Sequence, residues 1–172
     1  MTVTLQPTST FNVTASLGSH FVSFLATVVY PSWLTQPAVS YFADDLSIED
    51  NLPCYSLYHI PVGSQDIYQG RTGVASNTTR ETALLDVSCW VARDDAKTWQ
   101  AKLRTMADIV KAWHNRSASI VVMDYATSLS APAATQYLVR LTGADGVETG
   151  PDPNPDIERA RILVSYFWHM RA

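Results

Sequence analysis

The sequence predicts an α+β fold, with a mostly antiparallel sheet packed against two helices in a single domain of residues 1–172. The chain has 172 residues, which suits one domain and is short for two. Two segments repeat apolar residues every three or four positions, as helices do, and several others alternate apolar and polar residues, as strands do. The links between the last three strands suit antiparallel pairing. Both helices are expected to pack on one face of this sheet, which gives an α+β sandwich.

The first helix is expected over Thr10–Tyr30. Its apolar residues follow a spacing of four, three and four, which forms one stripe on a helix: Leu17, Phe21, Phe24 and Val28. Thr14 and Ser16 are candidates to cap its start. Pro31 is expected to end it, because proline lacks an N–H and disfavours helical conformation in the preceding residue.

The segment Pro31–Arg80 is the least regular part of the chain, with four prolines and three glycines. Within it, Cys54–Ile60 alternates in the manner of a strand. Gly63–Thr79 is polar and glycine-rich, which predicts an exposed loop or hairpin arm around residues 61–80. Because this connection is longer than the usual ~4–6 residues, we expect it to contact a neighbouring subunit.

A strand is expected over Glu81–Ala92, where apolar residues alternate with polar ones. Asp94 can cap the helix that follows, Asp95–His114. This second helix has the strongest pattern in the chain. Its apolar stripe is continuous and separates from the charged residues: Ala96, Trp99, Leu103, Met106, Val110 and Trp113.

The remainder of the chain predicts three strands. The first is the short apolar segment Ser119–Tyr125, followed by a loop of small residues at Ser128–Ala134. The second is Gln136–Thr142, and the third is the long Ile157–Met170. Between the last two lies Gly143–Asp156, whose glycines and prolines predict a turn-rich link.

The charge content restricts the classes of function. Charged residues make up 16% of the chain, below the usual ~25%. Such a surface suits a subunit that buries much of itself against other copies; the alternative is a monomer covered with Ser, Thr and Gln. The net charge is −4 and the chain has no run of Lys and Arg, which argues against strong nucleic-acid binding through phosphates.

Cysteine usage and hydropathy indicate a reducing compartment and no membrane span. Cys54 and Cys89 lie in strand-like apolar segments, where a reduced cysteine acts as a small hydrophobe. A single disulfide between them is the alternative. Met1–Ser9 lacks the basic region of a secretory signal. The apolar segment Phe21–Leu34 is too short and too interrupted to cross a bilayer.

The search for chemistry predicts no catalytic, cofactor-binding or metal site. The four histidines lack metal-ligand spacing, and no phosphate-binding glycine motif or nucleophile elbow occurs. One acidic cluster lies in an expected loop, which favours a solvated surface: Asp44, Asp45, Glu49 and Asp50. A strand carries Cys89 on its apolar side, so we expect a core thiol there. The protein is therefore expected not to be an enzyme.

Aromatic residues are the other candidates for function. Trp99 and Trp113 lie on the helical stripe and are expected in the core. Three further aromatic residues lie on expected strands that carry apolar residues at both odd and even positions: Trp90, Phe167 and His169. This pattern indicates that both faces of the sheet are covered there. The second cover is either a neighbouring subunit or the chain's own domain, and the sequence leaves these two alternatives open.

The order of elements resembles the tail terminator, or tail completion, proteins of tailed bacteriophages. The resembling residues span Glu81–Met170: the strand "ETALLDVSCWVARDD", the helix "AKTWQAKLRTMADIVKAW", the strand "SIVVMDY" and the closing strand "DIERARILVSYFWHM". Val87–Trp90 and Arg161–Phe167 echo patterns of that family. The segment Pro31–Arg80 is longer than expected for the family.

The resemblance implies a structural virion protein of the phage neck, assembled in the cytoplasm of the bacterial host. Such proteins form a ring, usually a hexamer, on the last ring of the tail tube, where they stop tube polymerisation and provide the surface that joins the head. The implied partners are other copies of the chain, the tail tube protein and a head–tail connector protein. Double-stranded DNA would pass through the ring without specific binding, which a slightly negative channel would suit.

A ring needs one patch that meets a different patch on the next copy. We expect Tyr68 and Arg71 on the arm to form one patch, and Trp90, Phe167 and His169 on the sheet to form the other. The alternatives are another head–tail connector such as a stopper or head-completion protein, a small hydrolase using Asp44, Asp45 or Cys89, and a small-molecule binding domain with a tryptophan-lined cleft.

Overall fold

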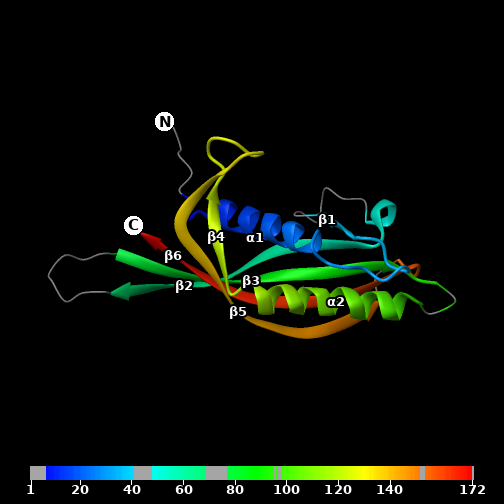
Figure 1. The fold of residues 1–172 in the computed structure, drawn as a ribbon. Coiled ribbons are helices and arrows are strands. Elements are labelled where there is room, and N and C mark those ends of the chain that lie inside the picture. Colours follow the sequence, from blue (N-terminus) through cyan, green and yellow to red (C-terminus); the bar gives the residue numbers. More distant parts are fainter. Residues whose placement is uncertain are drawn as a thin grey trace.

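The computed structural model describes residues 7–40, 48–68, 77–94, 96, 98–151 and 154–171. These residues form two α-helices, one short 3-10 helix and six strands (Figure 1). The bounds are α1 Thr10–Leu25, β1 Ala38–Ser40, the 3-10 helix η1 Glu49–Asn51, β2 Cys54–Tyr68, β3 Asn77–Ala92, α2 Thr98–Arg116, β4 Ser119–Asp124, β5 Ala133–Pro151 and β6 Ile157–Arg171.

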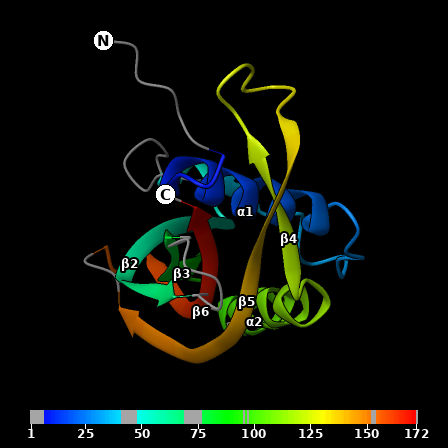
Figure 2. The same cartoon turned by 90° about the vertical axis from the view of Figure 1, so that its left-hand side faces the viewer.

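The six strands form one sheet in the order β1-β2-β3-β6-β5-β4. β1 is parallel to β2 and each of the other pairs is antiparallel, so the sheet is mixed. Figure 2 shows that the sheet curls strongly from β2 round to β5 and β4. The α+β class predicted from the sequence is confirmed. None of the helices that the structure describes is both long enough and apolar enough to cross a lipid bilayer.

One hydrophobic core joins both helices to one face of the sheet. The two helices meet where the Phe21 ring of α1 packs edge-on against Trp113 of α2, with ring centroids 5.0 Å apart. Alternate strand residues complete this core, as the period of two requires: Leu57, Ala83, Leu85, Val87, Cys89, Val139, Ile162, Val164 and Tyr166. Trp113 is fully buried and Trp99 packs at the border of the core, as their stripe predicts.

Polar side chains of α1 cover the outer edge of β4. The Ser16 hydroxyl accepts a hydrogen bond from the Met123 N–H at 2.8 Å, and the Asn12 amide oxygen accepts one from the Tyr125 N–H at 3.2 Å. An edge strand otherwise leaves such N–H groups open to pairing with another chain. The helix therefore packs its polar residues Asn12 and Ser16 inward, because they complete the hydrogen bonding of the sheet.

Replacing Ser16 with alanine is expected to lower the free energy of unfolding by about 1–3 kcal/mol, because the Met123 N–H loses its acceptor. Urea unfolding measures this loss. Ser23→Ala is the matched control: its hydroxyl donates to the Ser19 carbonyl at 3.0 Å, as that of Ser16 does to Asn12, but on the exposed side of the helix. The control is expected to change stability by less than ~0.5 kcal/mol, and equal losses would contradict this role of Ser16.

The predicted start and end of the first helix need correction. Ser9 is the N-cap, and its hydroxyl accepts from the Asn12 N–H at 3.4 Å. Thr14 and Ser16 lie inside the helix and donate to carbonyls one turn earlier. The helix also ends at Leu25, well before Pro31. Just after this end, the Thr27 hydroxyl donates a hydrogen bond to the Phe24 carbonyl at 2.7 Å. The β-branched residues that follow disfavour further helix.

The predicted link Gly143–Asp156 is also wrong over most of its length. β5 continues to Pro151 and pairs with β6 as far as Pro151↔Glu158. Its register shifts between Leu141 and Gly143 and again between Asp145 and Glu148. Gly146 has φ +73°, a conformation that glycine adopts without strain. The glycines therefore lie at β-bulge-like irregularities, where one long strand can bend with the curled sheet.

Candidate subunit interfaces

The long hairpin of β2 and β3 forms an arm. The two strands pair from Cys54↔Trp90 to Tyr68↔Asn77, with one register shift between Pro61 and Gly63. β6 continues beside β3 to Thr78↔Arg171. Figure 1 shows the paired ends of β2 and β3 extending past both helices. The predicted loop or hairpin around residues 61–80 is thus a paired hairpin over its described residues, and residues 69–76 lie outside them.

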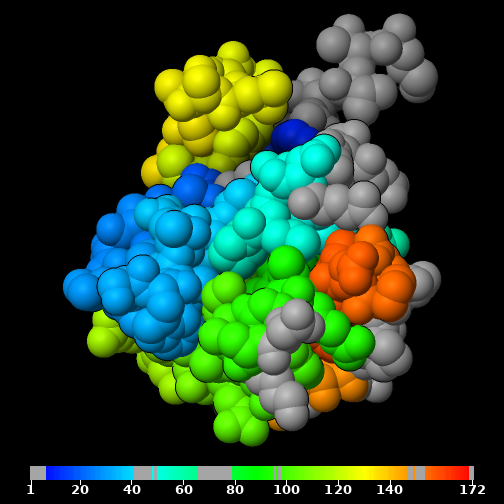
Figure 3. Space-filling model, turned by 90° about the vertical axis from the view of Figure 1, so that its right-hand side faces the viewer, coloured from blue at the N-terminus to red at the C-terminus, as the bar shows by residue number. Residues whose placement is uncertain are grey.

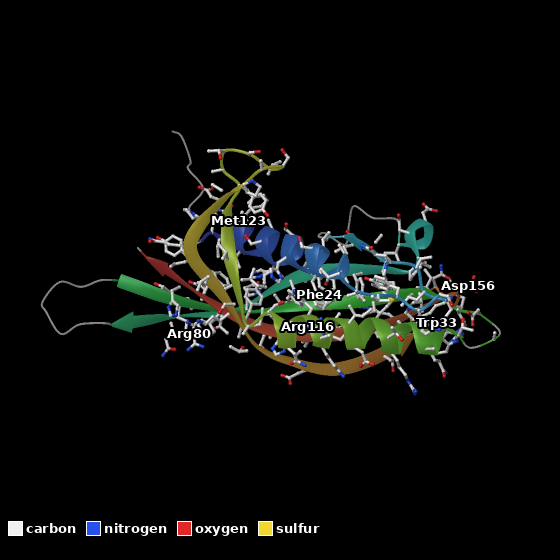
Figure 4. All side chains as sticks on the ribbon, viewed as in Figure 1. Phe24, Trp33, Arg80, Arg116, Met123 and Asp156 are labelled. Atoms are coloured by element: carbon white, nitrogen blue, oxygen red, sulfur yellow. The ribbon has the colours of Figure 1, made fainter. Side chains whose placement is uncertain are left out.

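An aromatic and cationic cluster lies at the base of this arm, on the sheet face away from the helices. The Arg80 guanidinium lies 3.9 Å from the centroid of the Phe167 ring, and the rings of Phe167 and His169 are 5.6 Å apart, edge to face. Figure 4 labels Arg80 at this position. His169 is exposed and Phe167 is half-buried. A cationic and aromatic cluster of this kind suits contact with a carboxylate-bearing or aromatic partner.

The same face carries a buried ionic network nearer the middle of the sheet. The Asp86 carboxylate accepts hydrogen bonds from Arg161 Nε at 2.7 Å and from the Ser88 hydroxyl at 3.1 Å. Arg159 donates to the Ser88 oxygen at 2.7 Å and lies 3.7 Å from Asp86. Two arginines thus surround one buried carboxylate, so the network orders two cations on this face.

The structure places the five predicted interface residues as follows. Tyr68 ends β2 opposite Asn77, and Arg71 lies outside the described residues. The other three share the sheet face away from the helices, the helix-free face: Trp90, Phe167 and His169. Trp90 pairs with Arg159 of β6, and side chains at every second residue of β6 after Arg159 point to the same face, which includes Phe167 and His169.

Trp90 is covered by its own chain. It is 8% exposed, its indole N–H donates to the Ser56 hydroxyl at 2.9 Å, and the Arg159 guanidinium lies 4.8 Å from its ring. Cys54 and Ile157 pack beside it. At the arm, the accessible residues of the helix-free face include His169, Phe167 and Arg80. Sequence reasoning missed Arg80, since its place beside Phe167 depends on the register of β3 and β6.

An open apolar pocket of about 590 Å³ lies between α1, β2 and the loop that joins β4 to β5. Its lining includes Phe11 and Ala15 of α1, Tyr58 and His59 of β2, and Leu129 of the loop. Tyr58 and Leu129 are 60% and 74% exposed as residues. The sequence predicted no such pocket, because its walls come from four segments that only the folded sheet brings together.

His59, which lines this pocket, makes a short polar contact with the core residue Tyr166. The Tyr166 hydroxyl oxygen is 2.5 Å from Nδ1 of His59. Burial lowers the pKa of His59 and raises the pKa of Tyr166, because both charged forms lose hydration. Both groups are therefore neutral at pH 7. The pocket is thus mainly apolar, and its histidine is neutral, which suits an apolar or aromatic group.

Of the residues considered for catalysis, Cys89 is described and does not line this pocket. Both cysteines are free and buried; burial raises the pKa of Cys54 to about 11 and that of Cys89 further still. Both are thus thiols at neutral pH, and a thiol is a poor nucleophile. Asp44 and Asp45 lie outside the described residues. Within the described ranges, no group of three or more His, Cys, Asp or Glu residues is placed to hold a metal ion.

Comparisons with known proteins add little to this geometry. No family model and no curated protein matches the chain. One solved structure, whose name describes no function, is similar over 94% of this chain and 95% of its own, with 8% sequence identity and a TM-score of 0.48. That degree of likeness carries no argument about function.

Proposed function

We propose that this chain is a structural protein of the neck of a tailed phage, which caps the tail tube as a homo-oligomeric ring. In this role it ends tube polymerisation and offers the surface that joins the head. The proposed partners are other copies of the chain, the tail tube protein and a head–tail connector protein, with double-stranded DNA passing through the ring. The proposal starts from the resemblance of residues 81–170 to tail terminator proteins.

One structural observation carries the proposal furthest: the β2–β3 arm extends beyond the helices, with exposed residues at 61–65 of β2 and partly exposed residues at 79–82 of β3. Packing of the core does not require this length, because Ala83 is the core residue of β3 nearest the arm and the strand continues beyond it to Asn77. A ring needs a patch that meets a different patch on the next copy. An arm that leaves its own core supplies one half of such a contact.

The surface composition supports the same assignment. Charged residues make up only 16% of the chain, and several large apolar side chains are exposed, among them Phe11, Tyr58 and Leu129. Contiguous exposed apolar surface marks interaction sites in most soluble proteins. Assembly into a ring would bury these residues against sister copies.

Native mass measurement of the purified protein, followed by negative-stain imaging, tests the proposal. We expect one closed oligomer, with six copies as in the resembling family, and a central hole in the images. Binding assays then separate the two kinds of neck protein, because a terminator binds tails that lack heads whereas a stopper binds filled heads. A stable monomer at high concentration would contradict the proposal.

A further inference from the structure

Two arginines adjoin one aromatic ring at the arm end of the helix-free face. The Arg80 guanidinium lies 3.9 Å from the centroid of the Phe167 ring, and the centroid of the His169 ring lies 5.6 Å from it. Arg140 of β5 pairs directly with Phe167 of β6, so its side chain points to the same face. Arg140 and His169 are exposed and Phe167 is half-buried. We call Arg80, Arg140 and Phe167 the cationic cluster.

The cationic cluster has no carboxylate of its own. Arg80 and Arg140 form no ion pair with any residue that the structure describes, whereas the two arginines nearer the middle of this face share the carboxylate of Asp86. Glu81 follows Arg80 on β3 and therefore points to the opposite face of the sheet. The Nε atom of Arg80 is buried and lacks an acceptor, so the domain leaves the hydrogen bonding of this guanidinium incomplete.

Exposed carboxylates lie at the opposite end of the molecule. Asp50 of η1 and Asp156, directly before β6, are both exposed, and we call them the acidic pair. A small apolar cluster holds their two segments together: Ile48, Leu52, Cys54, Trp90 and Ile157. Figure 3 looks onto this end, where the cyan segment around η1 and the orange segment before β6 both lie at the surface. Figure 4 labels Arg80 and Asp156 at opposite ends of the molecule.

Two cations near the acidic pair are already neutralised within the chain. Arg93 forms an ion pair with Glu158, and Lys102 Nζ lies 3.8 Å from an Asp94 carboxylate oxygen. Neither member of the acidic pair forms an ion pair among the residues that the structure describes. The arm end of the helix-free face thus carries unpaired positive charge, and the far end carries unpaired negative charge.

We propose that the cationic cluster of one copy binds the acidic pair of a second copy of this chain. The two surfaces lie at opposite ends of the molecule, so one copy cannot satisfy its own charges. Each contact leaves one free cluster and one free acidic pair, which is the head-to-tail arrangement that closes into a ring or continues as a filament. The chain has a net charge of −4, so this charge pattern also disfavours other orientations of two copies. The inference rests on the proposed ring and names a contact within it.

Two charge-reversal variants separate the halves of the contact. The arm-reversed variant carries Arg80→Glu and Arg140→Glu, and the end-reversed variant carries Asp50→Arg and Asp156→Arg. Alone, each variant places like charges in the contact, so we expect association at least ~30-fold weaker than in the wild type. Native mass measurement records the assembly, and circular dichroism checks that each variant is folded.

The charge reversal should be correctable in two ways. An equal mixture of the two variants should assemble with alternating copies, because the reversed arm meets the reversed end and the unchanged arm meets the unchanged end. A variant with all four substitutions should assemble alone, because every contact is again between opposite charges. Arg104→Glu with Lys111→Glu is the matched control, since it makes the same change of net charge on α2 and should assemble normally.

Salt dependence of the wild-type chain gives a test without substitutions. Raising NaCl from about 50 to about 500 mM should weaken association at least ~10-fold, because the contact is between exposed charges. Rings that are insensitive to salt, rings from either reversed variant alone, or assembly that neither the mixture nor the fourfold variant restores would overturn this contact. Wild-type rings would then leave the ring proposal standing, whereas a wild-type chain that remains monomeric would overturn both.

Discussion

Shortening the β2–β3 arm is expected to leave a folded protein that no longer closes into rings. Ser64 and Glu81 face each other across the hairpin, so residues 65–80 can be replaced by a two-residue Asn-Gly turn that joins them. The nearest core residue of β3, Ala83, stays in place. The arm would lose its outer strands and Arg80, and with them its proposed contact with the next copy. Native mass measurement and negative-stain imaging would record the change.

Two checks make this result specific to the arm. The shortened protein should keep a cooperative thermal transition within a few degrees of the wild type, because the deleted residues lie outside the core. A milder variant, Arg80→Ala, removes the cation above Phe167 and keeps the hairpin, so we expect weakened but detectable rings. Closed rings that survive complete removal of residues 65–80 would show that the arm has no part in assembly.

The elements with a strong local pattern could be predicted from the sequence. The continuous apolar stripe of α2 and the strict alternation of β3 place both elements within a few residues of their observed bounds. Asp94 lies four residues before α2 and is not its N-cap, but its carboxylate accepts a hydrogen bond from the Thr98 N–H at 2.8 Å and so satisfies one free N–H of the first turn. The predictions of α2 and β3 succeed because side-chain period is decided within a few neighbouring residues.

The second half of β5 could not be predicted, because its strand conformation depends on a distant partner. Gly143, Gly146 and Gly150 are local turn signals. Pairing with β6 overrides them, and the two register shifts in this segment absorb the irregular backbone. The same applies to the start of β2–β3 pairing at the arm, where a polar, glycine-rich sequence indicates a loop although most of its described residues are paired strands.

The candidate surfaces were predictable only in part. Strand parity alone places Phe167 and His169 on one face, and the structure confirms that geometry. The addition of Arg80 needs the register between β3 and β6. The pocket needs the curl of the sheet, since α1, β2 and the loop after β4 have no local signal that links them. Surfaces built from several elements follow from topology, which a single sequence specifies only through its complete fold.

Replacing Trp113 with alanine is expected to cause the largest loss of stability of any single substitution considered, about 3–5 kcal/mol. Trp113 is fully buried where α1, α2 and the sheet meet. Its ring packs against Phe21, and its indole N–H donates to Nδ1 of His20 at 3.0 Å. Burial lowers the pKa of His20, so at pH 7 the imidazole is neutral and can accept this bond. Alanine would leave a large cavity and a histidine nitrogen without its donor.

Urea unfolding of Trp113→Ala should be measured at several low protein concentrations, because ring assembly would stabilise the folded state by mass action. Trp113→Phe keeps an aromatic ring against Phe21 but has no N–H for His20, so an intermediate loss of about 1–2 kcal/mol is expected. Trp99→Ala is the matched control, since Trp99 lies on the same helix but only at the border of the core. If the losses at Trp99 and Trp113 were equal, the junction of the two helices would not be the central packing point of this fold.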